Sequence, residues 1–458
     1  MNKISILFLM LMLISTSAVA KQSLFVDNSQ TVQPSRSSDV STPIMSDSYD
    51  IEVDGLYYKI TSISDLTVEL VGGVGVYKGS IEIPSELEYR GKKLKVTSIG
   101  DEAFFKSNVT NVTIGENVKK IGRRAFYESA ISKIVIPSSV ITLGDYSFHG
   151  CSQLVDVNFE DGKKELRFDD AFVGCHNIRK LYIGRTLDYS LAGDYAFADL
   201  SNTLEIEIGP YVKTLKSFFL KGASKISSLR IPASVTYLGE GAFDGCVSLK
   251  SVIFEDGTNT LTYTSGHGST VGSFVNYDMF CDSPLNYVYI GRNCKVSESY
   301  FSSGSVFAHS PITKIDISDS VTELVKLLGL QKLQEINIPS SVVKMSSIGG
   351  DNLSRIVCNS TIPPVFDVYS GFSNSVYANA TLYVPKGCVK AYEGAKVWKN
   401  FFDIKEISLS GINDVPNDGQ ENQTNAFYDV NGVRHKNWVK GLNIIKTKNG
   451  IVKKIHVK

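Results

Sequence analysis

Hydrophobic and polar positions repeat along the chain with a period of just over twenty residues. The segments Val96–Phe104, Val118–Phe126 and Val140–Phe148 share one pattern: an aliphatic residue, then Ile or Leu three places on, then Gly, then Phe four places after the Gly. These phenylalanines stand at positions 104, 126, 148, 172 and 197, so the spacings are 22, 22, 24 and 25 residues. Self-similarity at this period is typical of a solenoid, a coil of stacked turns in which each turn contacts its neighbours.

A second pattern lies between these copies and predicts one short strand in each turn. It consists of two apolar residues two positions apart, which point to the same side of a strand. Pro or Gly usually follows and ends the strand. Short strands at regular intervals favour a parallel sheet with its apolar side inward, so we expect a mainly β solenoid. The pairs are Val112/Ile114, Ile134/Ile136, Val157/Phe159, Leu181/Ile183, Ile206/Ile208, Leu229/Ile231, Val252/Phe254, Val288/Ile290, Ile315/Ile317 and Ile336/Ile338.

The segments around the repeats predict further units. Residues 1–20 have the form of a signal peptide, with Lys3 before an apolar run and Ala18-Val-Ala20 at the end. We therefore expect export, to the cell surface or the medium. No other stretch has the ~18 consecutive apolar residues of a membrane-spanning helix, so an integral membrane protein is not expected. The predicted organisation is a signal peptide at 1–20, a flexible linker at 21–48, an N-terminal β cap at 49–93, the repeats at 94–358, a C-terminal cap at 359–410, a linker at 411–424 and a small β module at 425–458.

Two stretches depart from the regular pattern. Residues 257–274 are a surplus rich in Gly, Ser and Thr, which predicts a loop bulging from the edge of the coil. In the terminal module, Asn431-Gly432 and Asn449-Gly450 lie between alternating segments. Asn-Gly between such segments is a strong signal for a β-hairpin.

Composition limits the function classes. Lys plus Arg equals Asp plus Glu at 47 each, so the chain has no overall positive charge for binding nucleic acid. Cys151, Cys175 and Cys246 each follow a repeat phenylalanine by three residues, where other turns have Ser. A position that accepts Cys or Ser is most simply a tight packing position. A disulfide between Cys151 and Cys175 is the alternative.

The residues offer little for catalysis. His149, Cys151, Cys175 and His176 fall at nearly matching places in neighbouring turns and could form a zinc site of two Cys and two His. We expect no metal there, because the two cysteines occupy the packing position. The chain has no His/Glu helix motif, no Ser-His-Asp order and no Cys-x-x-Cys motif. A hydrolase built from dispersed carboxylates remains an unsupported alternative.

If the apolar pairs point inward, the residues beside them form rows on the outer face of the sheet. A solenoid presents such rows as a broad binding surface. Aromatic residues and Arg are typical interface anchors, although Tyr and Ile also simply favour strands. The candidate binding residues on this face are Tyr182, Arg230, Ile253, Tyr287 and Tyr289.

The repeat, aliphatic-x-x-Ile-Gly-x-x-Ala-Phe followed by Leu-x-x-Val-x-Ile-Pro, resembles the BspA-type leucine-rich repeat proteins of Bacteroidetes cell surfaces. The segment Leu382-Tyr-Val-Pro-Lys-Gly387 resembles the usual close of that family, and the tail resembles terminal sorting or anchoring modules. The resemblance implies a non-enzymatic surface or secreted protein without a cofactor, which binds host matrix or other cell-surface proteins. Glycan binding, with the Tyr rings as stacking platforms, is the alternative.

Overall fold

The computed structural model of the chain describes residues 44–407, except residues 46, 190–196, 198–199, 265, 271–272, 278, 281–282, 298–306, 308–309, 325 and 369. It also describes the backbone of four strands between residues 426 and 457. The predicted signal peptide and the linker at 411–424 lie outside the described residues, as does most of the linker at 21–48.

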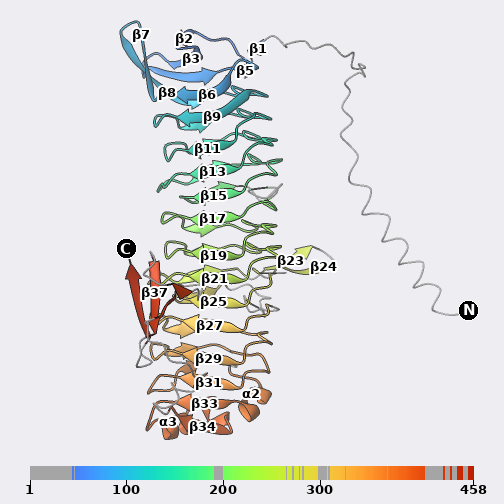
Figure 1. Ribbon diagram of the computed structural model, residues 1–458, viewed down its shortest axis with the longest axis vertical. Coiled ribbons are helices and arrows are strands. Elements are labelled where there is room, and N and C mark those ends of the chain that lie inside the picture. The colour runs from blue at the N-terminus through green and yellow to red at the C-terminus, as the bar shows by residue number, and fades with distance from the viewer. Residues whose placement is uncertain are drawn as a thin grey trace, which may run out of the picture. The chain divides into compact units, whose positions relative to one another are not determined.

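The repeats form a parallel β-solenoid, as predicted, with the strands of its main sheet stacked one above another (Figure 1). All the predicted apolar pairs lie in these strands. Breaks in the hydrogen bonding between neighbouring strands divide the sheet into three blocks. The first block contains β6 (Lys78–Ile83), β9 (Asn108–Ile114), β11 (Lys133–Ile136), β13 (Asp156–Phe159), β15 (Lys180–Ile183) and β17 (Glu205–Ile208). The second contains β19 (Ser228–Ile231), β21 (Ser251–Phe254), β25 (Tyr287–Ile290) and β27 (Lys314–Ile317), and the third contains β29 (Glu335–Ile338), β31 (Arg355–Cys358), β33 (Thr381–Val384) and β34 (Asp403–Glu406).

The expectation of one strand per turn was wrong, because a second parallel sheet runs along another side of the coil. Its strands hold the Ile or Leu that precedes the repeat Gly, such as Ile121 and Leu143. Most have only two or three residues, too few for an alternating pattern to reveal them. They are β8 (Lys92–Ile99), β10 (Lys120–Ile121), β12 (Thr142–Leu143), β14 (Leu166–Phe168), β16 (Leu187–Tyr189), β18 (Thr214–Leu215), β20 (Tyr237–Leu238), β22 (Leu261–Tyr263), β26 (Cys294–Val296), β28 (Glu323–Leu324), β30 (Lys344–Met345) and β32 (Val365–Phe366).

The repeat phenylalanines stack inside the coil. Ring centroids of Phe104, Phe126, Phe148 and Phe172 follow one another at 4.7, 4.9 and 5.1 Å, with interplanar angles of 14°, 4° and 1°. All four rings are buried. The Gly of the repeat permits this close stacking, because a Cβ on Gly122 would lie 2.6 Å from the backbone nitrogen of Asp101 one turn earlier. The sequence pattern therefore encodes both the core and the distance between turns.

The two ends of the coil are closed by different elements. At the N-terminal end, β2 (Ile51–Val53), β3 (Leu56–Ser62) and β4 (Thr67–Val71) form an antiparallel meander that joins β8, and β7 (Glu86–Tyr89) pairs with β8. A short β1 (Ile44–Met45) pairs with β5 (Gly73–Val74). At the other end, α2 (Asn374–Asn379), α3 (Val389–Gly394) and the 3₁₀ helix η1 (Trp398–Asn400) cover the last turns. Trp398 and Tyr392 are buried there.

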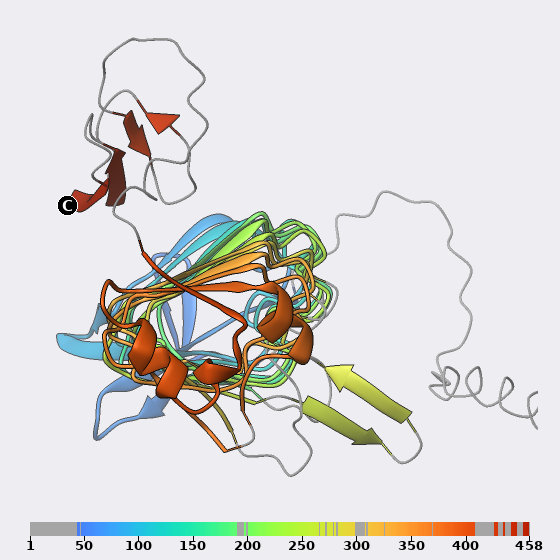
Figure 2. The ribbon, with the colours of Figure 1, turned by 90° about the horizontal axis from the view of Figure 1, so that it is seen from below.

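The surplus at 257–274 is not a simple loop, which corrects that expectation. Residues 261–263 continue the second sheet as β22. The next part forms an antiparallel hairpin of β23 (Gly266–Thr270) and β24 (Ser273–Tyr277), which projects from the coil (Figure 2). The hairpin was missed because Gly, Ser and Thr dominate its sequence.

The C-terminal module is a four-stranded antiparallel sheet in the order β36–β35–β37–β38. Its strands are β35 (Ala426–Tyr428), β36 (Arg434–His435), β37 (Gly441–Lys446) and β38 (Val452–Val457). β35 pairs antiparallel with β36, and β37 with β38, which confirms the strand pairing of both predicted hairpins. Among the described residues, no helix is long and apolar enough to cross a membrane.

Candidate binding face

The outer face of the second block brings four of the five predicted residues together. Arg230, Ile253 and Tyr289 are in register on three adjacent strands, and Asp316 continues the row. Tyr287 lies two residues before Tyr289 on β25, in the neighbouring row of Ser251 and Lys314. The residues that flank Arg230, Ile253 and Tyr289 on their strands are buried, so these three side chains point away from the core.

Hydrogen bonds hold the two tyrosines of this face in place. The Tyr289 hydroxyl donates to Asp256 Oδ1 at 2.8 Å, and the Tyr287 hydroxyl donates to Asp316 Oδ2 at 3.0 Å. Burial, together with the nearby Asp256, raises the pKa of Tyr289 to about 12. The ammonium of Lys314 lies 5.2 Å from the Tyr287 ring centroid. Both tyrosines are thus neutral at ordinary pH and fixed by their neighbours, as pre-organised contact residues should be.

Arg230 is paired but remains accessible. Its Nε donates to Glu255 Oε1, while Glu255 also accepts a hydrogen bond from the backbone nitrogen of Ala233 at 3.2 Å. The Arg230 side chain is 59% exposed. It can therefore meet a partner without breaking a buried ion pair.

Tyr182 does not join this cluster, although the sequence grouped it there. It lies in the first block, in register with Asn158 and Glu207, and β17 and β19 form no ladder with each other. Its hydroxyl donates to Asp161 Oδ1 at 2.7 Å. Partial burial and that carboxylate raise its pKa to about 12.

Tyr182 and Tyr289 occupy equivalent places in a duplicated structural unit. Each follows a Glu-Asp-Gly turn on the preceding strand, residues 160–162 and 255–257, and donates to the Asp of that turn. Each is also followed by Ile-Gly-Arg, and both arginines, Arg185 and Arg292, are fully buried. The hydroxyls of Tyr182 and Tyr289 are therefore hydrogen-bonded to the turn, and only their rings remain for contact with a partner.

The first block carries charge where the second carries aromatic residues. One of its outer rows reads Lys133, Asp156, Lys180 and Glu205 in register, so the charge alternates from strand to strand. Lys180 Nζ and Glu205 Oε2 are 3.5 Å apart. Such exposed pairs satisfy one another in water and contribute little to recognition.

The sequence analysis missed two other surfaces. On the third block, the Arg355 guanidinium lies 4.1 Å from the Tyr383 ring centroid and its Nε donates to Glu335. At the C-terminal cap, Val365 and Val368 are 69% and 74% exposed beside a hollow of about 300 Å³. The apolar pairs of the repeat end at Ile336/Ile338, so they predict neither Arg355 nor Tyr383. The cap has no repeat pattern that could predict the second surface.

The four residues of the zinc hypothesis have other contacts. The thiols of Cys151 and Cys175 donate to the carbonyls of Phe126 and Phe148 at 3.0 Å each. Both are free thiols, not a disulfide, and both are buried as the packing position predicts. The His149 ring stacks on Tyr127 at 4.7 Å. In the part of the chain that the structure describes, no group of three or more His, Cys, Asp or Glu side chains is arranged to hold a metal ion.

Comparison with known proteins identifies the repeats. The model of the BspA type leucine rich repeat region matches in six copies, over residues 83–190 and 168–303. Solved structures with similar folds include a leucine rich cell surface protein from Faecalibacterium prausnitzii (18% identity over 83% of this chain and 100% of that one, TM-score 0.34) and a leucine-rich repeat protein from Bacteroides ovatus (19%, 79% and 100%, 0.36). The pneumococcal vaccine antigen PcpA is also similar (15% identity, 78% of this chain and 98% of that one, 0.29). No curated protein matches the chain.

Proposed function

Residues 83–303 of this chain are BspA type leucine-rich repeats, and from that premise we propose that it is an exported protein that binds other proteins through the outer face of the second block. Proteins built from such repeats are typically non-enzymatic. The partners we propose are host extracellular matrix proteins or proteins of other cell surfaces. The signal-peptide pattern of residues 1–20 supports export.

The observation that carries the proposal is the in-register row of Arg230, Ile253 and Tyr289, with Tyr287 beside it. A protein interface depends on a few anchors, typically aromatic residues and Arg, surrounded by polar groups. Here the anchors lie on three adjacent strands, and their neighbours include Asp316 and Lys314. The anchors stand on hydrogen-bonded strands, so binding does not require the backbone beneath them to become ordered.

The contacts that Tyr287 and Tyr289 already make favour protein binding over glycan binding. A sugar stacks on an open aromatic face, but the Tyr287 ring already has the Lys314 ammonium 5.2 Å from its centroid. Both hydroxyls are also occupied by carboxylates. A partner protein can instead contact the exposed atoms of these side chains without an open ring face.

The test is capture of immobilised extracellular matrix proteins by the purified chain, with a glycan array in parallel. We expect Ile253→Glu to weaken capture at least about tenfold, because a charge in the centre of an apolar contact costs more than ~1.4 kcal/mol. Val135→Glu is the matched control: Val135 is 42% exposed on the same sheet but in the first block. Equal losses for both variants, or binding to glycans alone, would defeat the proposal.

A further inference from the structure

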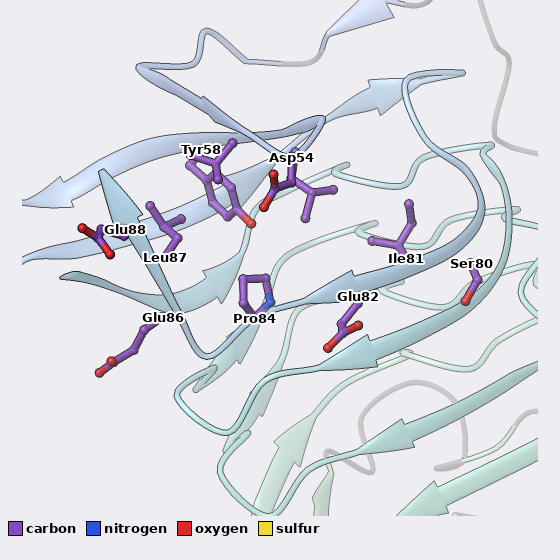
Figure 3. A pocket seen from close by; sticks show the side chains of 11 residues that line it. Asp54, Tyr58, Ser80, Ile81, Glu82, Pro84, Glu86, Leu87 and Glu88 are labelled. Atoms are coloured by element: carbon purple, nitrogen blue, oxygen red, sulfur yellow. The ribbon is translucent and has the colours of Figure 1, made fainter. Parts of the chain in front are cut away.

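A hollow of about 630 Å³ opens at the N-terminal end of the solenoid, away from the candidate binding face (Figure 3). Its apolar lining includes Leu56, Tyr58, Ile81 and Leu87, from three different strands. Acidic side chains surround this lining, and no Lys or Arg lines the hollow. The carboxylates are Asp54, Glu82, Glu86 and Glu88.

These four carboxylates are available to a ligand. All four are exposed, and none forms an ion pair within the described part of the chain. Glu86 and Glu88 have Lys95 and Lys93 directly opposite on β8, whereas Glu82 has Thr113 opposite on β9. The attraction for a positively charged segment therefore comes mainly from Asp54 and Glu82.

Tyr58 adds a polar group to the apolar lining of the hollow. The residue is 1% exposed overall, and it lines the hollow. Figure 3 shows the hydroxyl pointing into the hollow, toward Asp54. The Tyr58 hydroxyl and the Asp54 carboxylate thus offer a ligand a hydrogen-bond donor beside an acceptor.

The hollow also contains a free sheet edge. Strand β6 is the last strand of the first block and pairs only with β9 among the described strands, while its residues Ser80, Ile81 and Glu82 line the hollow. The unpaired backbone N–H and C=O groups of an edge strand can accept another strand. The site therefore fits an extended, basic segment that adds to the edge of β6.

The chain itself contains a segment with these properties. Strand β38 is an edge strand of the C-terminal module and has the sequence Val-Lys-Lys-Ile-His-Val. The module is strongly basic, with a single acidic residue, Asp429, in a chain of zero net charge. Its basic residues are Arg434, Lys436, Lys440, Lys446, Lys448, Lys453, Lys454 and Lys458.

The length of the segment between the solenoid and the C-terminal module favours a contact between two copies over a contact within one copy. The main sheet has fourteen described strands from β6 to β34, hence thirteen steps between strands, which at ~4.8 Å per step span about 62 Å. Residues 408–425 could span this only if fully extended, because 18 residues reach at most about 60–65 Å. A second copy has no such restriction.

We propose that strand β38 of one copy adds to the edge of β6 in a second copy, with its lysines beside the four carboxylates of the hollow. Because the two surfaces differ, the contact is head-to-tail and links copies into closed rings or open chains. Neither strand of this contact belongs to the second block, so it uses none of the candidate binding residues.

The test is sedimentation of the full chain over a range of concentrations at low ionic strength. The wild type should form oligomers whose mass rises with concentration and falls with salt. The pocket variant D54N/E82Q/E86Q/E88Q and the tail variant K453E/K454E should each weaken self-association at least about tenfold. An equimolar mixture should form one-to-one dimers, because the pocket variant still has its tail and the tail variant still has its pocket.

Two controls separate this contact from general charge effects. The variant E116Q/E165Q/D319N/E393Q makes the same change of charge at exposed carboxylates elsewhere and should assemble like the wild type. Tyr58→Phe removes only the hydroxyl and should weaken association several-fold. A monomeric wild type at every concentration, an equal loss in the control variant, or no dimers in the mixture would overturn the proposal.

Discussion

Removal of one stacked phenylalanine tests the architecture of the repeats. Phe126 is fully buried between Phe104 and Phe148, at centroid distances of 4.7 and 4.9 Å. Phe126→Ala leaves a cavity, which costs ~3–5 kcal/mol, and removes two ring pairs worth ~0.5–1.5 kcal/mol each. We therefore expect a loss of about 5 kcal/mol in the free energy of unfolding.

Two further variants show whether this loss arises from stacking. Phe126→Leu refills most of the volume and loses mainly the ring pairs, so we expect about 1–2 kcal/mol. Phe402 is 83% exposed, and Phe402→Ala should change the unfolding free energy by less than ~0.5 kcal/mol.

The assay is urea unfolding followed by far-ultraviolet circular dichroism and by tryptophan fluorescence. In a Trp438→Phe background, the fluorescence comes from buried Trp398 alone, which reports on the C-terminal cap, far along the coil from Phe126. Coincident shifts of both signals would show that the coil unfolds as one unit, whereas separate shifts would show independent segments. A Phe126→Ala loss no larger than that of Phe402→Ala would refute the stacked core.

Three other measurements follow from buried polar groups. The Arg185 guanidinium donates to four backbone carbonyls, those of Ile136, Pro137, Ser138 and Val140. Arg185→Met should therefore lower the free energy of unfolding by ~3–5 kcal/mol, and Arg185→Lys should lower it less. Equal losses for the two variants would contradict a role for the planar guanidinium. The hydrogen bond from Lys216, then the one from Arg167, lowers the pKa of Asp188. The ionised Asp188 carboxylate thus stabilises the folded state above the unfolded pKa of ~3.9, and this stabilisation is lost as the pH falls through the lower pKa of the folded state. Asp188→Asn should therefore make the urea midpoint less sensitive to acid below about pH 4. Burial raises the pKa of the Cys246 thiol to about 12, whereas Cys388 is half-exposed. In a Cys281→Ser variant, maleimide should therefore label Cys388 before Cys246. The reverse order would contradict the packing of Cys246.

The repeat pattern was enough to predict the main sheet and its inward residues. Ile136, Phe159 and Ile183 are in register, as their spacing from the repeat phenylalanines requires. The same periodicity predicted which residues share the outer row of Arg230 and Ile253. Both follow from one local rule, that residues two apart on a strand face the same side.

Features that depend on contacts between distant segments could not be predicted in this way. Tyr182 appeared to continue the row of Tyr289, but hydrogen bonding stops between β17 and β19, and no feature of the repeat marks that break. The buried role of Arg185 requires carbonyls more than forty residues earlier in the chain. The hollow beside β6 likewise combines three strands whose sequences share no pattern.

The central claim is that partners bind the outer face of the second block. Hydroxyl-radical footprinting of the chain, alone and bound to a captured matrix protein, measures it residue by residue. The account predicts that oxidation of Ile253, Tyr287 and Tyr289 falls on binding while that of Val135 is unchanged. Protection of Val365 at the C-terminal cap, with no change at Ile253, would contradict it.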